Sequence, residues 1–339
     1  MRQLYSAIPG VTSPLSIRVS ESHGAATATM TFDCESTTLD IGDTVSADLG
    51  YVDEHEVVFN GYVKQIERKA PDDIITVTAQ DELVKLADYF IVSSTPDTAF
   101  KRRNIIMETL VSDLIGLIGL SLYEYTPTSF TIGVSTDIEI NIISLYDIVK
   151  QLSDIITWSI WADHNGRIYF KNRKPFVMKG TSGQPGDVAD VAVNVGNPIT
   201  DLTVLNIAYS IDELDLRNRV VVYGRQGTDA EESSSLSYDP RSDSDEQILP
   251  VGFYKTILAA LPYIDETSEA QKAAEYNLNL YNRLTDKISM TMTGSPSLHA
   301  RSVLEISSTF MSLSGDWYIF SLDHNWTKSG FTTTLELRR

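Results

Sequence analysis

The sequence predicts a mainly β protein of the α+β class with a small α/β insertion. Three observations support this fold class. Apolar and polar residues alternate in short runs from Leu15 to about Asp81, apolar residues recur at helical spacing between residues 105 and 156, and alternation returns from Leu202 to the end of the chain. At 339 residues the chain is long enough for two or three domains, each with its own core.

The first segment, residues 1–93, is predicted to be a β domain. Its short runs are rich in β-branched residues and are separated by turns of Gly, Asp and Pro, a pattern typical of a barrel or a sandwich. After Asp81 the spacing changes, because Leu83, Leu86 and Phe90 recur at helical intervals. We therefore expect a short helix to close this first β unit.

Residues 94–177 are predicted to form the α/β insertion. Two apolar stripes at helical spacing, residues 105–118 and 145–156, indicate two helices. Ser144, followed three residues later by Asp147, resembles a capping box and places the start of the second helix. Asn165-Gly166, between two apolar runs, indicates a tight hairpin, because these residues readily adopt positive φ angles.

Residues 178–200 are rich in Gly and Pro and are predicted to be a linker or exposed loop. Residues 201–339 are predicted to form the second β domain. Within it, residues 226–247 are rich in Ser and Asp and are expected to be a mobile acidic loop. Residues 268–284 are expected to be a helix whose N-terminus Ser268 caps.

Two distant segments of the chain have similar patterns. Residues 59–66 and 75–78 form one hairpin pattern, and residues 318–326 and 331–337 form another. Two related β-barrels that flank the insertion would explain the similarity economically. Alternatively, the segments are alike only because all hairpins with alternating faces are alike. The first explanation predicts two related β-barrel domains plus the small α/β domain.

The chain is strongly acidic, with 46 Asp and Glu against 27 Lys and Arg and a formal net charge of −19. A whole surface of this sign is a poor candidate for holding DNA or an anionic membrane. The single cysteine, Cys34, excludes a disulfide framework within the chain. The most apolar window, Ile105 to Leu120, contains two acids and is short for a bilayer span, so we predict a soluble protein with no membrane partner.

No common catalytic motif occurs, since G-x-S-x-G, Walker A and G-x-G-x-x-G patterns are all missing. Asp53, Glu54 and Glu56 could offer a glycosidase carboxylate pair, but they fall in a predicted turn, where solvated side chains are the simpler interpretation. The acids at residues 243–246 lack the glycine and distal glutamate of an EF-hand loop. The five histidines are scattered along the chain. They are His23, His55, His164, His299 and His324. We therefore predict that the protein is not an enzyme and has no catalytic residues, cofactor or metal site.

The densest basic cluster is Lys101-Arg102-Arg103, which the pattern places at the start of the first insertion helix. Two interpretations stay open for it. The cluster is either a solvated helix end or a docking site for an acidic partner.

Several motifs, weak singly, together resemble a known family in their order along the chain. They are Phe59-x-Gly61-x-Val63-x-x-Ile66, Thr76-Val77-Thr78-x-x-Asp81 before a short helix, the Ser144 helix with the Trp158 strand and the Asn165-Gly166 hairpin, Arg217-Asn218-Arg219-Val220-x-Val222-x-Gly224, and the closing hairpin from Tyr318 to Leu337. This arrangement resembles the central baseplate hub proteins of tailed phages, which include late-control proteins and the N-terminal part of type VI secretion spike proteins. The resemblance spans nearly the whole chain.

This resemblance implies a structural virion protein. It implies a homotrimer whose two tube-type β-barrels per chain form a pseudo-sixfold ring, joining a hexameric tail tube to a trimeric central spike and leaving a channel for DNA. Because the sequence ends at Arg339, just after the second hairpin, we expect the spike to be a separate protein. Tape-measure and baseplate wedge proteins are further expected partners. The expected location is the tail tip or baseplate of the virion, after synthesis in the host cytoplasm.

Two other classes of function stay open. One is a tail-associated cell-wall hydrolase acting on glycans, which the lack of a placed acid/base pair disfavours. The other is a carbohydrate-binding β module, which would need exposed aromatic side chains on one sheet face. The 16 tyrosines allow such a module without demonstrating it.

The acidity is concentrated, because no Lys or Arg occurs between Arg18 and Lys64. If the chain is a hub, we expect acids of this interval to line the channel, where repulsion of phosphate lets DNA pass without specific binding. The alternative is that they provide solubility or reflect a salty habitat. The candidate channel-lining acids are Asp33, Glu35, Asp40, Asp43, Asp48, Asp53, Glu54 and Glu56.

Overall fold

The structure is a computed structural model of the chain. It describes residues 2–71, 73–93, 99–171, 191–194, 203–225, 228–233, 236–238, 247–250, 254–308, 311 and 313–339. Strands predominate in these residues, and the helices among them are α1 to α4. None of the described helices has the length and apolar character needed to cross a membrane.

The first β unit contains six strands that follow one another along the chain. They are β1 (Leu4–Ala7), β2 (Val11–Ser22), β3 (Thr29–Thr37), β4 (Thr44–Tyr51), β5 (Glu54–Lys69) and β6 (Ile74–Gln80). Alternation decides which face is buried: Met30, Phe32 and Cys34 of β3 are fully buried, while the intervening Asp33 lies on the opposite face. The apolar faces of these strands form one core, as the period-two pattern predicted.

The second β unit comes mainly from the C-terminal part of the chain. It contains β16 (Val191–Asn194), β17 (Val204–Asp212), β23 (Thr285–Thr293), β24 (Val303–Ser308), β25 (Leu313–Thr327) and β26 (Gly330–Arg338). Its core is built around the fully buried Trp317, with Ile319 and Leu337 on neighbouring strands. β16 lies inside residues 178–200, which we predicted to be a linker, and pairs in parallel with β24. The rest of that predicted linker is outside the described residues.

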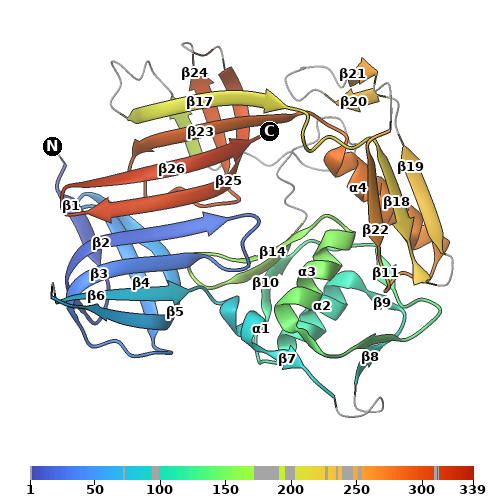
Figure 1. The fold of residues 1–339 in the computed structure, drawn as a ribbon, viewed down its shortest axis with the longest axis horizontal. Coiled ribbons are helices and arrows are strands. Elements are labelled where there is room, and N and C mark those ends of the chain that lie inside the picture. The colour runs from blue at the N-terminus through green and yellow to red at the C-terminus, as the bar shows by residue number, and fades with distance from the viewer. Residues whose placement is uncertain are drawn as a thin grey trace.

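The two β units are joined into one 12-stranded sheet. β2 pairs antiparallel with β25, with Ser16 opposite Thr327 and Ser22 opposite Ser321. The main strand order is β1-β4-β5-β6-β3-β2-β25-β26-β23-β17, with β24 and β16 attached beside β25. In Figure 1 the two units therefore lie one above the other. The described strand pairs do not close either unit on itself. The predicted fold class included two closed β-barrels, and the described residues do not show them.

The insertion and the end of the predicted first domain, residues 84–91, together pack three short helices against small sheets, and we call this block the insertion from here on. Its helices are α1 (Val84–Asp88), α2 (Met107–Gly116) and α3 (Leu145–Ile155). Its strands are β7 (Phe90–Ile91), β8 (Phe100–Arg102), β9 (Ile105–Ile106), β10 (Leu122–Tyr125), β11 (Thr131–Ile132), β12 (Ile138–Ile140), β13 (Ile143–Ser144), β14 (Ser159–Ala162) and β15 (Ile168–Lys171). Two local predictions are confirmed. The Ser144 Oγ accepts the Asp147 N–H at 3.0 Å, and β14 and β15 form a hairpin in which Gly166 has φ +77°.

A second α/β layer packs on the insertion. It contains β18 (Arg219–Tyr223), β19 (Asp229–Ser233), β22 (Thr256–Ala260) and α4 (Thr267–Tyr281), next to the pair β20 (Leu236–Tyr238) and β21 (Gln247–Pro250). We call these elements the α4 layer. Its Val220 and Ala273 share one continuous core with Leu110 and Leu152 of the insertion. Residues of the predicted second β domain thus complete the core of the insertion, although the predicted domain boundaries themselves stay a prediction.

Two details of the α4 layer differ from the sequence prediction. Helix α4 begins at Thr267, and its N-cap is Glu266 without a side-chain cap bond, so Ser268 is not the cap. The segment 226–247, expected to be a mobile acidic loop, contributes β19, which pairs antiparallel with β18. The sequence did not indicate this strand because its composition is polar. A polar composition is tolerated here because β19 lies at the edge of its sheet. The remainder of that segment includes residues outside the described ranges.

Polar contacts fix the α4 layer onto the insertion. The Asp265 carboxylate accepts the backbone N–H groups of Val134, Ser135 and Thr136 at 2.9, 3.0 and 2.6 Å. These charge-assisted bonds hold the turn before α4 against the loop between β11 and β12. Figure 1 shows α2 and α3 beside the lower β unit and the α4 layer at the far side of the insertion.

Gly61 of the Phe59-x-Gly61-x-Val63 motif occupies a position where a larger residue would cause a steric clash. A Cβ at this position would collide with the carbonyl oxygen of Gln80 on β6 and would press on the Phe59 ring. Because the Gln80 contact is backbone, it can be relieved only by moving the β5–β6 ladder.

We expect Gly61→Ala to lower the free energy of unfolding by about 1–3 kcal/mol, since overpacking strains the strand pair. Urea titration of both proteins by circular dichroism measures this change. Gly24→Ala is the matched control, because nothing lies within 4 Å of its added Cβ. Equal losses in the two variants would contradict the steric explanation.

Candidate functional site

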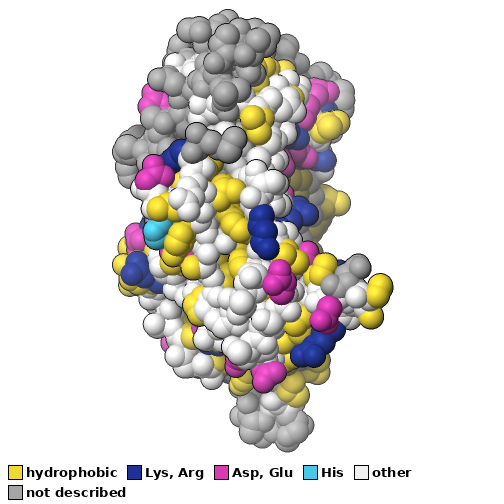
Figure 2. Space-filling model, turned by 90° about the vertical axis from the view of Figure 1, so that its left-hand side faces the viewer, with side chains coloured by type: hydrophobic (Ala, Val, Ile, Leu, Met, Phe, Trp, Pro, Cys, Tyr) yellow, Lys and Arg dark blue, Asp and Glu magenta, His cyan; other side chains and the backbone are white. Residues whose placement is uncertain are grey.

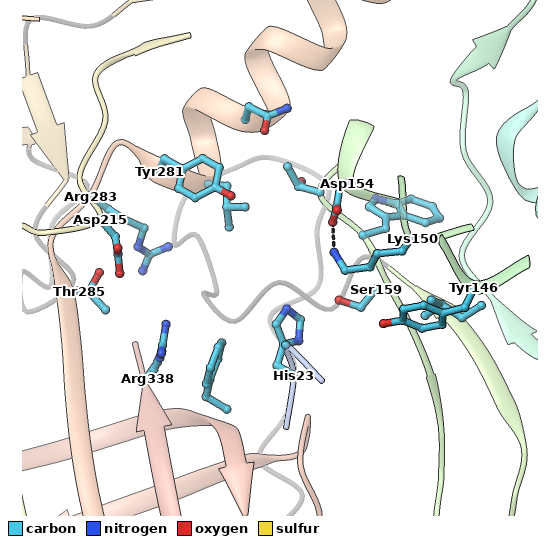
Figure 3. Close-up of a pocket in the computed structure, with 17 residues that line it drawn as sticks. His23, Tyr146, Lys150, Asp154, Ser159, Asp215, Tyr281, Arg283, Thr285 and Arg338 are labelled. Atoms are coloured by element: carbon cyan, nitrogen blue, oxygen red, sulfur yellow. Dashed lines mark hydrogen bonds and ion pairs between the residues drawn. The ribbon is translucent and has the colours of Figure 1, made fainter. Parts of the chain in front are cut away.

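A cavity lies where the insertion, the α4 layer and the sheet meet. Its volume is about 470 Å³. Tyr146 and Lys150 come from α3, Tyr281 from the end of α4, and Arg338 from β26. Figure 3 shows these side chains around the hollow, with His23 reaching it from the turn after β2. The site is therefore built from three parts of the fold.

The lining of this cavity carries charges of both signs. Lys150 forms an ion pair with Asp154 one turn along α3 (Figure 3). The Arg338 guanidinium lies 3.4 Å from the centre of the Phe320 ring and 2.7 Å from a Glu336 oxygen. Lys150 and Arg338 are thus held by neighbouring side chains.

His23 is neutral at ordinary pH. Burial lowers the pKa of His23 to about 3, and the nearby charges of Arg301, Lys150 and Arg338 contribute in the same direction. Its Nδ1 lies 3.3 Å from the hydroxyl of Tyr318, and its ring packs edge-on against the same tyrosine. The imidazole therefore packs against Tyr318 and Phe320 of β25 at the edge of the cavity.

The hydroxyls and carboxylates of the lining can be compared with the groups that common hydrolytic mechanisms need. The Ser159 and Thr157 hydroxyls line the cavity, but in the described part of the chain neither is hydrogen-bonded to a histidine or a carboxylate that could activate it. A glycosidase would need a carboxyl with a raised pKa next to an ionised one. The described acids on the lining are Asp215 and Asp154, and Asp154 pairs with Lys150.

Most acids of the residue 19–63 interval are partnered by groups from elsewhere in the chain. Arg2 pairs with Asp53 at 3.0 Å and with Glu54 at 2.7 Å. Asp48 pairs with His55 at 2.9 Å. The sequence did not indicate these partners. Arg2 lies outside the interval, in the N-terminal segment before β1, and His55 is neither a Lys nor an Arg.

The other acids of the interval fall into two groups. Asp33 accepts hydrogen bonds from the hydroxyls of Ser16 and Thr76 at 2.9 and 2.7 Å, and Glu35 lies 3.9 Å from Lys328. Asp40 and Asp43 are exposed on the turn before β4 and form no ion pair with a described Lys or Arg. Figure 2 shows one face of the molecule, on which acidic side chains are interspersed with basic and apolar ones rather than gathered together.

Glu56, the last of the candidate channel-lining acids, lies close to two histidines that are distant in sequence. Glu56, His164 and His299 each place one potential ligand atom within 4.8 Å of the others. Nothing in their sequence spacing could have revealed this group, because β5, the β14–β15 turn and the segment before β24 contribute one residue each.

The basic cluster lies on a strand and not at a helix start. Lys101 and Arg102 are on β8, five or more residues before α2 begins. Lys101 is 3.7 Å from Glu139, Arg102 is 2.8 Å from Asp113, and Arg103 donates to the Ser135 carbonyl at 3.0 Å. The predicted position at a helix start is wrong because β8 pairs with β12. A strand of three residues is too short to show an alternating pattern in the sequence. All three cations keep partial exposure.

A family model described as YQBQ-like matches residues 15–338 of this sequence. The chain belongs to the YQBQ-like family. No curated protein matches the sequence. The matched region covers both β units, the insertion and the α4 layer, so membership in the YQBQ-like family applies to the whole architecture.

Solved structures show that this YQBQ-like chain has the fold of tail proteins. It is similar to a tail protein from Neisseria meningitidis, with 8% identity, a TM-score of 0.69 and coverage of 99% of this chain and 97% of the other. It is also similar to a 43 kDa tail protein of a Shewanella oneidensis prophage, with 12% identity, a TM-score of 0.63 and coverage of 99% and 96%. A type VI secretion component from E. coli has 9% identity, a TM-score of 0.54 and coverage of 98% and 76%. The resemblance to baseplate hub and type VI spike proteins is thus confirmed for the fold.

The buried neutral state of His23 makes stability depend on pH. The unfolded chain takes up a proton near pH 6.5, while folded His23 resists it down to about pH 3. This group therefore contributes a loss of stability as pH falls below 6.5. We expect His23→Phe, which keeps a ring, to lose less stability between pH 7.5 and 5 than the wild type does.

Urea unfolding at the two pH values, in the presence of a chelator, measures that difference. His55→Phe is the control, because His55 is exposed and pairs with Asp48. A His23→Phe variant whose stability changes with pH as steeply as that of the wild type would contradict the assignment.

Proposed function

We propose that this protein is a structural component of a phage-type tail, a trimeric hub that joins the hexameric tail tube to a trimeric spike and leaves a channel for DNA. The observation that carries the proposal is the fold match to a tail protein over 99% of this chain and 97% of the other. A domain grafted onto an unrelated enzyme would not match both chains over almost their full length.

The open sheet supports an assembling role. Among the described strands, β1 and β17 each have a single partner and lie at the two ends of the main path. The outer edge of such a strand can pair with a strand of another chain, which makes β1 and β17 candidate sites for closing a ring. In the proposed trimer, the two β units of each chain contribute two of six tube-type positions, and ring closure replaces the barrel closure that a single chain lacks.

The proposed partners follow from this position. They are two further copies of the chain, the tube protein, a separate spike protein, and tape-measure and wedge proteins at the baseplate of the virion. Lys101, Arg102 and Arg103 are the proposed docking cations for an acidic partner, because all three stay partly exposed on one edge of the insertion. The proposed domains keep the boundaries 1–93, 94–177, 178–200 and 201–339.

The oligomeric state tests the hub directly. We expect native mass spectrometry of the full chain at micromolar concentration to show a trimer of about three times 37.7 kDa. A monomer at every concentration would contradict the hub. Release of glycan fragments from purified peptidoglycan by the same sample would favour the tail-associated hydrolase instead.

The channel assignment concerns the acids between residues 19 and 63. We propose that Asp40 and Asp43 face the channel with other acids of this interval, because they are exposed and unpaired with described cations. Repulsion of phosphate would then keep the passing DNA from binding.

We expect the double variant Asp40→Lys, Asp43→Lys to assemble normally but to slow DNA release from the particle, because four units of charge change per chain. Ejection kinetics measured with a DNA-binding dye would show the delay. The matched control reverses Asp137 and Glu275, which are exposed acids outside the interval. An unchanged ejection rate for the first variant would contradict the channel position.

A further inference from the structure

Glu56, His164 and His299 form a cluster that the assembly role does not explain. Each contributes one nitrogen or oxygen within 4.8 Å of the other two. Glu56 belongs to the first β unit, His164 to the β14–β15 turn of the insertion, and His299 to the segment between β23 and β24 of the second β unit. Three modules thus bring one potential metal ligand each to the same point.

His299 is the most unusual member of the cluster. Its ring nitrogens are buried, and neither forms a hydrogen bond with any described residue. A buried imidazole nitrogen without a hydrogen bond is costly, so such an atom calls for a ligand. The Nδ1 atom faces the largely buried Glu21 carboxylate at 3.7 Å, and Glu21 itself accepts a hydrogen bond from the Ala300 N–H at 3.0 Å.

The position of Glu21 beside His299 matches the way in which proteins orient metal-binding histidines. A metal-bound imidazole usually has a carboxylate or carbonyl on its other nitrogen, which sets the ring orientation and the tautomer. Glu21 has that position for Nδ1 of His299 and leaves Nε2 for a metal ion.

His164 is oriented in a similar way. Its ring lies parallel to that of His299, with centroids 4.1 Å apart and 15° between the planes. Its Nε2 lies 2.8 Å from the side-chain amide of Asn165. Because the oxygen and nitrogen of an amide can exchange positions, Asn165 can accept from Nε2–H and leave Nδ1 of His164 for a metal ion.

Glu56 supplies the negative charge. Unlike its neighbours Asp53 and Glu54, which pair with Arg2, Glu56 has no ion pair or side-chain hydrogen bond with a described residue. It also extends from a rigid strand, because Glu56 pairs with Leu49 in the β4–β5 ladder. A carboxylate held beside two imidazoles is a ligand set that suits Zn²⁺ and similar divalent ions.

We propose that Glu56, His164 and His299 bind one divalent transition-metal ion, with Zn²⁺ as the best match, and that this ion clamps the insertion hairpin to the two β units. Ligand atoms around a tetrahedral zinc ion are about 3.3 Å apart, given bonds of about 2.0–2.1 Å. The ligand atoms lie within 4.8 Å of one another, so they need to move about 1–2 Å closer together, which side-chain rotations can provide. Water completes the coordination, and the ion reinforces the junction of the three modules.

The test uses the full chain without a histidine tag, stripped with a chelator and dialysed against Zn²⁺. The number of metal ions per chain is measured by inductively coupled plasma mass spectrometry, and thermal unfolding is followed with and without Zn²⁺. We expect about one Zn²⁺ per wild-type chain and a rise in Tm of at least roughly 2 °C. Substitution of Co²⁺ should give the strong visible absorption of a tetrahedral site.

Variants distinguish this site from adventitious binding. His164→Asn and Glu56→Gln change residues at an exposed turn and an exposed strand end, so both should fold and bind Zn²⁺ at least tenfold more weakly. His55→Asn is the matched control, since His55 precedes Glu56 but pairs with Asp48 outside the cluster, and it should bind as the wild type does. A wild-type chain that binds no Zn²⁺, or cluster variants that bind it as tightly as the wild type, would overturn the proposal.

Discussion

The pairing of β2 with β25 is the interaction on which the rest of this structure depends. It joins strands about 300 residues apart, from Ser16 opposite Thr327 to Ser22 opposite Ser321. The same ladder places Trp326 and Phe331 of the second unit in the core of the first. Without it the two β units would be separate sheets with exposed inner edges, and neither would have a fixed place for the insertion.

Everything at the junction follows from that ladder. β2 ends in Glu21, Ser22 and the turn that carries His23, so the ladder aims Glu21 at His299 and His23 at the cavity below α3. The insertion enters from the first unit and the α4 layer returns to the second, and their shared core makes them one block. The block is therefore attached to both β units of the sheet.

The strong acidity has a different meaning after folding. Along the sequence the interval from residue 19 to 63 is purely acidic, but in the folded chain Arg2 and Lys328 approach it, and hydroxyls satisfy Asp33. What remains unpaired in the described residues is a smaller set, Asp40 and Asp43 on a turn and Glu56 beside two histidines. These acids carry the proposed channel and metal assignments, because a charge without a local ion pair interacts more strongly with another ligand.

The sequence by itself determined the local elements, since their signals lie within a few residues. The alternation in β3, the Ser144 cap and the Asn165-Gly166 turn all appear where they were expected, because each depends on backbone geometry and the solvent preference of adjacent side chains. The order of those elements was also enough to indicate the tail-protein fold. Local signals were weaker at β8 and β19, where pairing with a distant strand outweighs composition.

Only the tertiary structure decided how the modules meet. The open 12-stranded sheet, the core shared by the α4 layer and the insertion, and the approach of Glu56, His164 and His299 all depend on contacts between residues more than a hundred positions apart. No periodicity records such contacts, because long-range pairing is selected by the free energy of burying whole faces together and not by the preference of any one residue.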